Sequence, residues 1–197
     1  MRLILASSSP YRQDMLKRLG LPFRALAPDV DESPLPGEAP AALALRLARA
    51  KAATVARRHP DALVIGADQV ATFEGRPIGK PGDHERAVAQ LRLLSGRRVE
   101  FHSALCVTDG RRDEVDDIVT TCVFRELDTA EINHYLLRER PYDTAGSAKA
   151  EGLGIALMDA MHSDDPTAII GLPLIALSRM LRSFGMNPLL AAAGAPA

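Results

Sequence analysis

The spacing of apolar residues along the first third of the chain predicts alternating strands and helices. Short continuous apolar runs are typical of buried strands, whereas apolar residues three or four positions apart are typical of one helix face. The run ALVIGA, which ends immediately before Asp68, contains no polar side chain, so we expect a strand that is buried on both faces. The strands predicted in this part cover residues 2–6, 23–27 and 62–67, and the predicted helices cover residues 10–20 and 41–58.

The pattern changes after residue 70, where alternating apolar residues indicate antiparallel hairpins. A short hairpin is expected over residues 70–78 and a long one over residues 99–123. Because strands and helices alternate first and hairpins follow, the sequence predicts an α/β fold with a mixed sheet. The remaining predicted helices begin at Asp83, at a capping box formed by Asp128 and Glu131, and at Pro173, while residues 29–40 and 143–154 are expected to be loops.

The composition is that of an ordinary globular protein and argues against several classes. The 197 residues are 47% hydrophobic and 25% charged, which fits one domain over residues 1–190 and an alanine-rich end, 191–197, that we expect to fray. The formal net charge of −1 argues against a nucleic-acid binder, and no apolar stretch approaches the ~20 residues of a membrane span. Cys106 and Cys122 are too few for a disulfide framework. We therefore expect a cytoplasmic protein with reduced thiols.

The segment from Ser7 to Arg12 is the first candidate for chemistry, because it follows a predicted strand and begins a predicted helix. Free backbone N–H groups and the positive end of the helix dipole favour phosphate at such a turn. The serine hydroxyls and the Arg12 guanidinium add further donors. The alternative is that Ser9 only caps the helix and that Arg12 is a solvated surface residue.

Several charged positions are further candidates, each with an ordinary structural alternative. Asp68 directly follows a predicted buried strand, where ligands of α/β proteins bind, but it also suits an Asx turn that starts a hairpin. Lys51 and Lys80 suit phosphate, although each taken singly is expected to be solvated. Asp31 and Glu32 offer oxygen ligands to a hard cation, or form a solvated acidic loop. The five histidines show no metal spacing and are expected on the surface or at helix ends.

A series of short motifs, in order along the chain, resembles the Maf family of nucleoside triphosphate pyrophosphatases. The resemblance extends from Leu3 to about Leu189. It implies an elongated mixed sheet flanked by helices, with two lobes and a central cleft as in inosine triphosphate pyrophosphatases, and often a homodimer. The motifs are LASSSPYRQ, PDVDE, RLARAKA, GADQV, GKP, AGSAKAEGLGI and GLPLIAL.

The resemblance also implies an activity and roles for individual residues. Family members hydrolyse the bond between the α- and β-phosphates of a nucleotide and need a divalent cation, for which we consider Mg²⁺, Mn²⁺ and Co²⁺. Asp68 matches the proton acceptor, and Glu32 and Asp68 are the expected metal-site residues. The residues that match the phosphate-binding positions are Ser8, Arg12, Lys51 and Lys80.

Three further positions indicate a subgroup and therefore a substrate. Tyr11, Gln69 and Glu151 resemble the YceF-type subgroup, which implies 7-methyl-GTP, whereas the subgroup that cleaves dTTP and UTP has Arg, Thr and Gln there. An aromatic ring at Tyr11 can stack on the positively charged 7-methylguanine, and Glu151 can accept hydrogen bonds from its Watson–Crick edge. The alternatives are dTTP, UTP or another modified nucleotide as the substrate, or a non-catalytic nucleotide-binding regulator of cell division.

Overall fold

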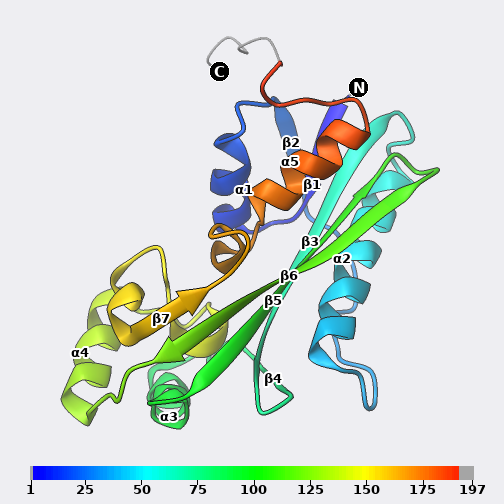
Figure 1. Ribbon diagram of the computed structural model, residues 1–197. Helices are drawn as coiled ribbons and strands as arrows, with labels where there is room; N and C mark the ends of the chain where they lie inside the picture. Colours follow the sequence, from blue (N-terminus) through cyan, green and yellow to red (C-terminus); the bar gives the residue numbers. More distant parts are fainter. Residues whose placement is uncertain (1, 191–197) are drawn as a thin grey trace.

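The computed structural model describes residues 2–190 and contains a seven-stranded mixed sheet flanked by helices (Figure 1). The predicted tail, 191–197, lies outside the described residues, and no helix within 2–190 is long and apolar enough to cross a membrane. The strands are β1 (Arg2–Ala6), β2 (Phe23–Leu26), β3 (Ala62–Phe73), β4 (Arg76–Ile78), β5 (Arg98–Thr108), β6 (Asp113–Phe124) and β7 (Met158–His162). The helices are α1 (Pro10–Lys17), α2 (Pro40–Ala56), α3 (His84–Leu94), α4 (Thr129–Glu139) and α5 (Leu174–Ser183), with short 3₁₀ turns η1 (Ala145–Ser147), η2 (Leu153–Leu157) and η3 (Ala168–Ile170).

Three long strands connect the two ends of the molecule. β3, β5 and β6 contain 12, 11 and 12 residues, and β5 pairs antiparallel with both of the others. β1 lies parallel to β2 and β3, so the order is β2-β1-β3-β5-β6-β7, with β4 paired to β3. The predicted α/β fold with a mixed sheet and both predicted hairpins are therefore confirmed, although the first helix ends at Lys17 rather than near Gly20.

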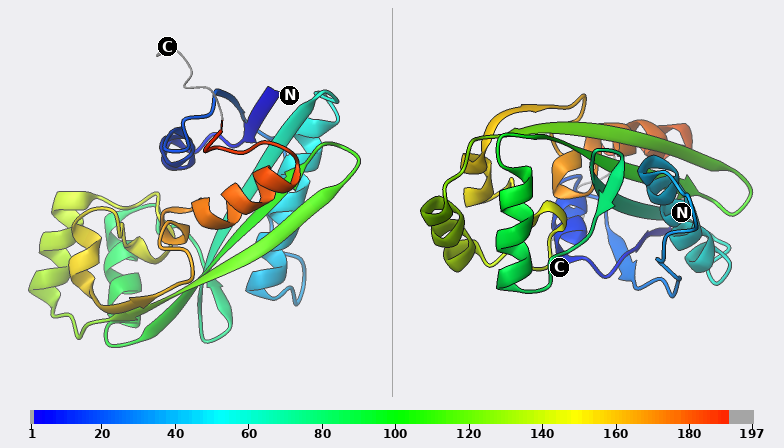
Figure 2. Two further views of the ribbon diagram at one scale, coloured as in Figure 1. Left: turned by 45° about the horizontal axis from the view of Figure 1, so that its top comes forward. Right: turned by 90° about the horizontal axis from the view of Figure 1, so that it is seen from below.

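The core consists of three apolar clusters, which divide the molecule into two lobes. At one end, one face of β1, β3 and β5 packs against α1 and α5, and the opposite face packs against α2. At the other end, β3, β5 and β6 pack against α3 and α4. Figures 1 and 2 show the long strands passing from one group of helices to the other. This arrangement gives the elongated, two-lobed shape that the resemblance implied.

β3 continues beyond the point where its apolar run ends, which corrects one prediction. We expected the strand to end before Asp68, but β3 extends to Phe73, and Asp68 lies within it opposite Ala104 of β5. The apolar run itself is buried throughout, as predicted. The strand continues through a carboxylate because β5 pairs with it on both sides of Asp68 and because Lys51 of α2 contacts that carboxylate.

The other edge of β3 has two partners with a gap between them. β1 pairs with residues 62–66 and β4 pairs with residues 71–73, so residues 67–70 have no strand partner on this edge among the described residues. The turn that follows β1 and the loop that follows β4 both contribute side chains to the space beside this gap. The gap therefore fixes where a ligand can approach the centre of the sheet.

The sequence does not predict β7, because Met158–His162 shows no clear alternation of apolar and polar residues. This segment is a strand because it pairs antiparallel with the end of β6, where the register shifts between Val123 and Phe124. A long-range pairing of this kind overrides weak local preference.

Cys106 and Cys122 are buried free thiols, as predicted. Burial raises the pKa of each thiol to about 12, so both stay protonated at neutral pH. A protonated buried thiol is a poor nucleophile, so neither cysteine is a candidate for catalysis.

His102 contradicts the expectation that the histidines lie on the surface or at helix ends. It lies within β5, its side chain is 14% exposed, and its Nδ1 is 2.7 Å from Oδ2 of Asp117 on β6. The hydrogen bond with Asp117 raises the pKa of His102 above its ordinary value of 6.5, although burial acts in the opposite direction. The pair is therefore an ion pair over a wider pH range than an isolated histidine would allow.

We expect this ion pair to make the stability of the fold depend on pH. Because the pKa of His102 is higher in the folded chain, the stabilisation is complete below about pH 6.5, the unfolded pKa, and is lost as pH rises through the folded pKa. Urea denaturation of the wild type and Asp117→Asn over this range measures the effect. The difference in unfolding free energy between them should shrink as pH rises. A difference that stays constant would contradict the expectation.

Candidate active site

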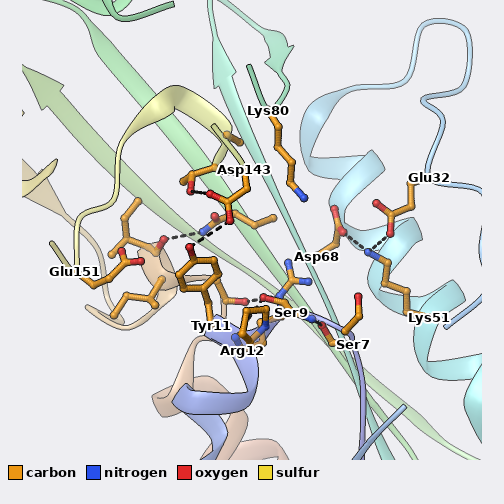
Figure 3. A pocket seen from close by; sticks show the side chains of 18 of the residues that line it. Ser7, Ser9, Tyr11, Arg12, Glu32, Lys51, Asp68, Lys80, Asp143 and Glu151 are labelled. Atoms are coloured by element: carbon orange, nitrogen blue, oxygen red, sulfur yellow. Dashed lines mark hydrogen bonds and ion pairs between the residues drawn. The ribbon is translucent and has the colours of Figure 1, made fainter. Parts of the chain in front are cut away.

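A cavity of about 410 Å³ opens beside the gap in the β3 edge and is lined by both lobes. A volume of this size suits a small-molecule ligand. Figure 3 shows side chains from α1, α2, β3 and several loops turned toward the same space. The residues that the family resemblance singled out all line this cavity, namely Ser8, Tyr11, Arg12, Glu32, Lys51, Asp68, Gln69, Lys80 and Glu151. Asp31, the other candidate for a cation ligand, does not line it; it is exposed, and its Oδ1 accepts from the Ser33 N–H.

The turn between β1 and α1 is built by its own serines. The Ser9 N–H donates to Ser7 Oγ at 3.1 Å, and Ser9 Oγ accepts from the Arg12 N–H at 3.4 Å, so Ser9 caps α1 as predicted. Ser7 is buried, whereas Ser8 is exposed in the cavity wall. Two serines therefore shape the turn, and Ser8 is the hydroxyl best placed to meet a ligand.

Arg12 is anchored rather than solvated. Its Nε donates to the backbone oxygen of Gly171 at 3.0 Å, which fixes the guanidinium at the cavity wall. Burial lowers the pKa of Arg12 below its ordinary 12.5, while the nearby carboxylates of Asp68 and Glu32 act in the opposite direction. Arginine keeps its charge under such conditions, so Arg12 is a fixed cation facing two acidic groups.

Lys51 lies between two carboxylates and is buried, contrary to the solvated alternative. Its Nζ is 2.7 Å from Glu32 Oε1 and 2.6 Å from Asp68 Oδ1. Lys51 is only 4% exposed and Asp68 only 7%, whereas Glu32 is exposed. Lys80 is exposed and also lines the cavity, and its side chain extends toward Asp68 in Figure 3. The lysines thus contribute one buried and one exposed cation to the same cavity.

Close packing of α2 on β3 brings Lys51 within reach of Asp68. Gly66 of β3 faces α2, and a Cβ at this position would lie 2.1 Å from the Ala48 backbone oxygen and 2.7 Å from the Ala52 backbone nitrogen. Only glycine allows this approach. The short distance between Lys51 Nζ and Asp68 Oδ1 therefore depends on a glycine two residues before Asp68.

Asp68 has an environment that suits a proton acceptor. Burial raises its pKa above the ordinary 3.8, and Glu32 adds to this effect, while Lys51 and Arg12 act against it. A raised pKa brings a carboxylate closer to the pH at which it accepts a proton effectively. Asp68 therefore lies within the central strand β3 as a buried carboxylate that contacts Lys51 and feels the charge of Arg12.

Glu32 and Asp68 were the expected metal-site residues, and their chemistry fits a hard cation only in part. Residues 2–190 contain no group of three His, Cys, Asp or Glu side chains able to hold a metal. Two carboxylates suit Mg²⁺-like ions, which commonly take one or two protein carboxylates and complete their shell with phosphate oxygens and water. The donor set thus fits a cation that arrives with a phosphorylated ligand.

The other side of the cavity is aromatic and acidic. Tyr11 and Glu151 lie there, separated in Figure 3 from Glu32, Lys51 and Asp68. Gln69 also lines the cavity, but its Nε2 donates to Ser103 Oγ, Ala168 O and Ile169 O at 3.0, 2.9 and 3.1 Å. Its amide nitrogen therefore anchors η3, and only its amide oxygen remains for a ligand.

Sequence reasoning missed two residues that contribute to this side. Asp143 lines the cavity and accepts a hydrogen bond from the Tyr11 hydroxyl at 3.2 Å, across 132 sequence positions. Lys149 Nζ lies 3.5 Å from Asp143 Oδ1 and 5.4 Å from the centre of the Tyr11 ring. No local pattern predicts these contacts, because Asp143 and Lys149 belong to a loop that the fold alone brings to α1.

Gln90 of α3 connects the loops on two sides of the cavity. Its Nε2 donates to the Gly79 backbone oxygen at 3.0 Å, and its Oε1 accepts from the Ser147 hydroxyl. Ser147 is fully buried with φ of +53°, a conformation that residues other than glycine rarely adopt. The bridge fixes the loop that carries Lys80 relative to the loop that carries Asp143.

Comparisons with known proteins identify relatives over almost the whole chain. The family described as Maf-like protein matches residues 2–184. A 7-methyl-GTP pyrophosphatase of Bordetella avium is 70% identical over 188 residues, which cover 95% of each chain. A 7-methyl-GTP pyrophosphatase of Burkholderia orbicola is 65% identical over 92% of this chain and 89% of its own.

Among solved structures, the Ham1 protein of Staphylococcus aureus covers 64% of this chain and 73% of its own, at 16% identity and a TM-score of 0.47. A likeness of that strength carries no conclusion. The sequence match to the family is much stronger evidence, because it spans nearly every element of the fold. It includes the β1–α1 turn, α2, β3 and the loops that form the cavity. This chain belongs to the Maf family.

Proposed function

We propose that this protein is a nucleoside triphosphate pyrophosphatase that hydrolyses 7-methyl-GTP to 7-methyl-GMP and pyrophosphate. The observation that carries the proposal is the convergence of Arg12, Lys51 and Lys80 with the buried Asp68 in one cavity. Fixed cations suit a triphosphate, which is a polyanion, and a carboxylate with a raised pKa suits the activation of water. The names of the relatives from Bordetella and Burkholderia support the same substrate.

In the proposed reaction, a water molecule attacks the α-phosphorus and Asp68 accepts its proton. The bond from the α-phosphorus to the oxygen that bridges it to the β-phosphorus breaks, and the electron pair leaves with pyrophosphate. Arg12, Lys51 and Lys80 stabilise the charge that develops there, and the loss of one such contact costs about 2–4 kcal/mol. Ser8 and the N-terminus of α1 would bind further phosphate oxygens.

We also propose that a divalent cation, Mg²⁺, Mn²⁺ or Co²⁺, binds with the nucleotide. When bound, the cation supplies positive charge that offsets the phosphates. Glu32 and Asp68 would hold it from the protein side. Lys51 contacts both carboxylates and would keep them in place when no cation is bound.

The charge of the cavity favours a nucleotide with a cationic base. Arg12, Lys51, Lys80, Glu32 and Asp68 together carry a net positive charge where the phosphates would bind. The acidic and aromatic side of the cavity would meet the base. A 7-methylguanine ring is positively charged, so it suits Tyr11 by a cation–π contact and suits nearby carboxylates by simple attraction.

A nucleotide panel tests the proposal. Pyrophosphate release from 7-methyl-GTP, GTP, dTTP and UTP is measured with Mg²⁺, Mn²⁺ or Co²⁺, and the products are identified. We expect kcat/KM for 7-methyl-GTP to exceed that for GTP by roughly 5- to 30-fold, the equivalent of a 1–2 kcal/mol cation–π contact. A chelator should stop the reaction.

The same panel decides between the alternatives. A higher kcat/KM for dTTP or UTP than for 7-methyl-GTP would mean that the substrate is that of the other subgroup. Release of orthophosphate would contradict cleavage between the α- and β-phosphates. Tight nucleotide binding without product would favour a non-catalytic regulator. The homodimer and the cytoplasmic location implied above stay predictions.

A further inference from the structure

We propose that Asp143 is a specificity-determining residue, the carboxylate that recognises the positive charge of the base, and that Tyr11 and Lys149 position it. The inference rests on the proposed function and deepens it, because it names the group that would separate 7-methyl-GTP from GTP. The juxtaposition that carries it is a cavity-lining carboxylate contacted by Tyr11 of the distant helix α1 and by Lys149 of its own loop.

Asp143 is fixed by several contacts although its side chain is exposed to the cavity. The Tyr11 hydroxyl donates to its Oδ2 at 3.2 Å, and Lys149 Nζ lies 3.5 Å from its Oδ1. Thr144 Oγ1 also donates to Oδ1, at 3.4 Å. A carboxylate that is already oriented loses less conformational freedom when a ligand binds, so its interactions contribute more to selectivity.

Lys149 is a suitable support because its own backbone is fixed. Its N–H donates to the hydroxyl of Tyr135 at 3.0 Å, and Gly154 packs so closely that a Cβ there would lie 2.4 Å from the Lys149 backbone oxygen. Its side chain is 17% exposed, and its ammonium group lies over one face of the Tyr11 ring. Because Lys149 covers one face, only the other face of Tyr11 remains for a base.

Glu151 was the carboxylate expected from the sequence, but it lacks such support. It lines the cavity and is exposed, and it forms no ion pair with any residue in the range 2–190. It must therefore be ordered at the moment of binding, at an entropic cost. Of the two carboxylates on this side of the cavity, Asp143 is the one that is pre-oriented.

The charge count on this side gives the expected effect of removing Asp143. Asp143 and Glu151 are negative and Lys149 is positive, so the three carry a net charge of −1 when all are ionised. Burial acts to raise the pKa of Asp143, but Lys149 and hydrogen bonds outweigh it and lower the pKa, so Asp143 is ionised at neutral pH. Asp143→Asn makes the net charge zero and weakens the preference for a cation over a neutral ring, while the Tyr11 ring still favours the cation.

The test compares Asp143→Asn, Asp143→Glu and Glu151→Gln with the wild type. The first readout is the ratio of kcat/KM for 7-methyl-GTP to that for GTP. The second is the ratio of the affinities for 7-methyl-GMP and GMP, measured by calorimetry, which requires no turnover. Asp14→Asn is the matched control, because it removes an exposed carboxylate of α1 that pairs with Lys17 outside the cavity.

We expect Asp143→Asn to lower both ratios by roughly 5- to 20-fold, as for the loss of one charge contact that is largely screened by water. Asp143→Glu should recover part of the loss, Glu151→Gln should lower the ratios less than Asp143→Asn, and Asp14→Asn should leave them unchanged. Unchanged ratios in Asp143→Asn, or a larger fall in Glu151→Gln, would overturn the inference.

The two readouts also separate this inference from the proposed function. If the wild type releases no pyrophosphate but still binds 7-methyl-GMP more tightly than GMP, the proposed reaction fails while the binding ratios of the variants still test Asp143. If the wild type binds 7-methyl-GMP and GMP equally, the inference about Asp143 is wrong whatever the turnover.

Discussion

Replacing Asp68 with asparagine should lower kcat by a factor of about 10²–10⁴, the usual effect of losing a positioned general base. Asparagine has nearly the same size, so the pairing of β3 with β5 should persist, but the amide cannot accept the proton of an attacking water. Nucleotide binding should survive, because Arg12 and Lys80 are unchanged. Kinetics of pyrophosphate release measure the first effect, and calorimetry with 7-methyl-GTP measures the second.

The fold of Asp68→Asn should be at least as stable as that of the wild type. Burial raises the pKa of Asp68, so the charged carboxylate is disfavoured in the folded chain and its removal should not weaken folding at neutral pH. Lys51 keeps Glu32 as a partner. Asp61→Asn, an exposed position just before β3, is the control and should retain wild-type kcat. If kcat of Asp68→Asn stays within about threefold of wild type, Asp68 is not the base.

Replacing Gly66 with alanine should destabilise the protein by about 3 kcal/mol or more, at the upper end of the overpacking effects seen in well-packed cores. The new Cβ would lie 2.1 Å from the Ala48 backbone oxygen and 2.9 Å from Ala52 Cβ, so α2 itself would have to move. A flexible side chain could adjust, but two of the three nearest atoms belong to helix backbone. Urea denaturation measures the loss.

The Gly66 substitution should also lower activity in any fraction that folds. α2 carries Lys51, so displacement of the helix would separate Lys51 Nζ from Asp68 Oδ1, now 2.6 Å apart. Gly79→Ala is the matched control for stability, because a Cβ at Gly79 meets no atom within 4 Å and its φ is not in the left-handed region. A Gly66→Ala protein as stable as Gly79→Ala would show that α2 can shift freely.

The parts of the fold that the sequence predicts are those with local causes. Ser9 with Pro10 begins α1, the capping box of Asp128 and Glu131 begins α4, and the alternation on either side of the Asp109-Gly110 turn gives the β5–β6 hairpin. These features depend on residues close in sequence. β7 and the continuation of β3 through Asp68 depend instead on pairing with distant strands, so local pattern fails there.

In the candidate site, too, local sequence identifies some residues, whereas others are found only through contacts between distant segments. Taken singly, Lys51 suggests a solvated lysine, and only the resemblance to a family placed it with Arg12, Asp68 and Lys80. The structure brings these residues to one cavity because β1, α2, β3 and β4 end or pass beside the same gap. Asp143 was not predictable, since its contact with Tyr11 crosses 132 positions and no local motif marks it.

The interrupted edge of β3 has a further consequence for solubility. Exposed strand edges promote edge-to-edge aggregation, and β3 contains one of the most apolar segments of the chain. Here the open stretch covers only residues 67–70, ends against β1 and β4 on its two sides, and contains the charged Asp68. A second chain could add few ladder hydrogen bonds before meeting those strands. The interruption therefore leaves room for a small ligand at the middle of the sheet but prevents another strand from pairing along that edge.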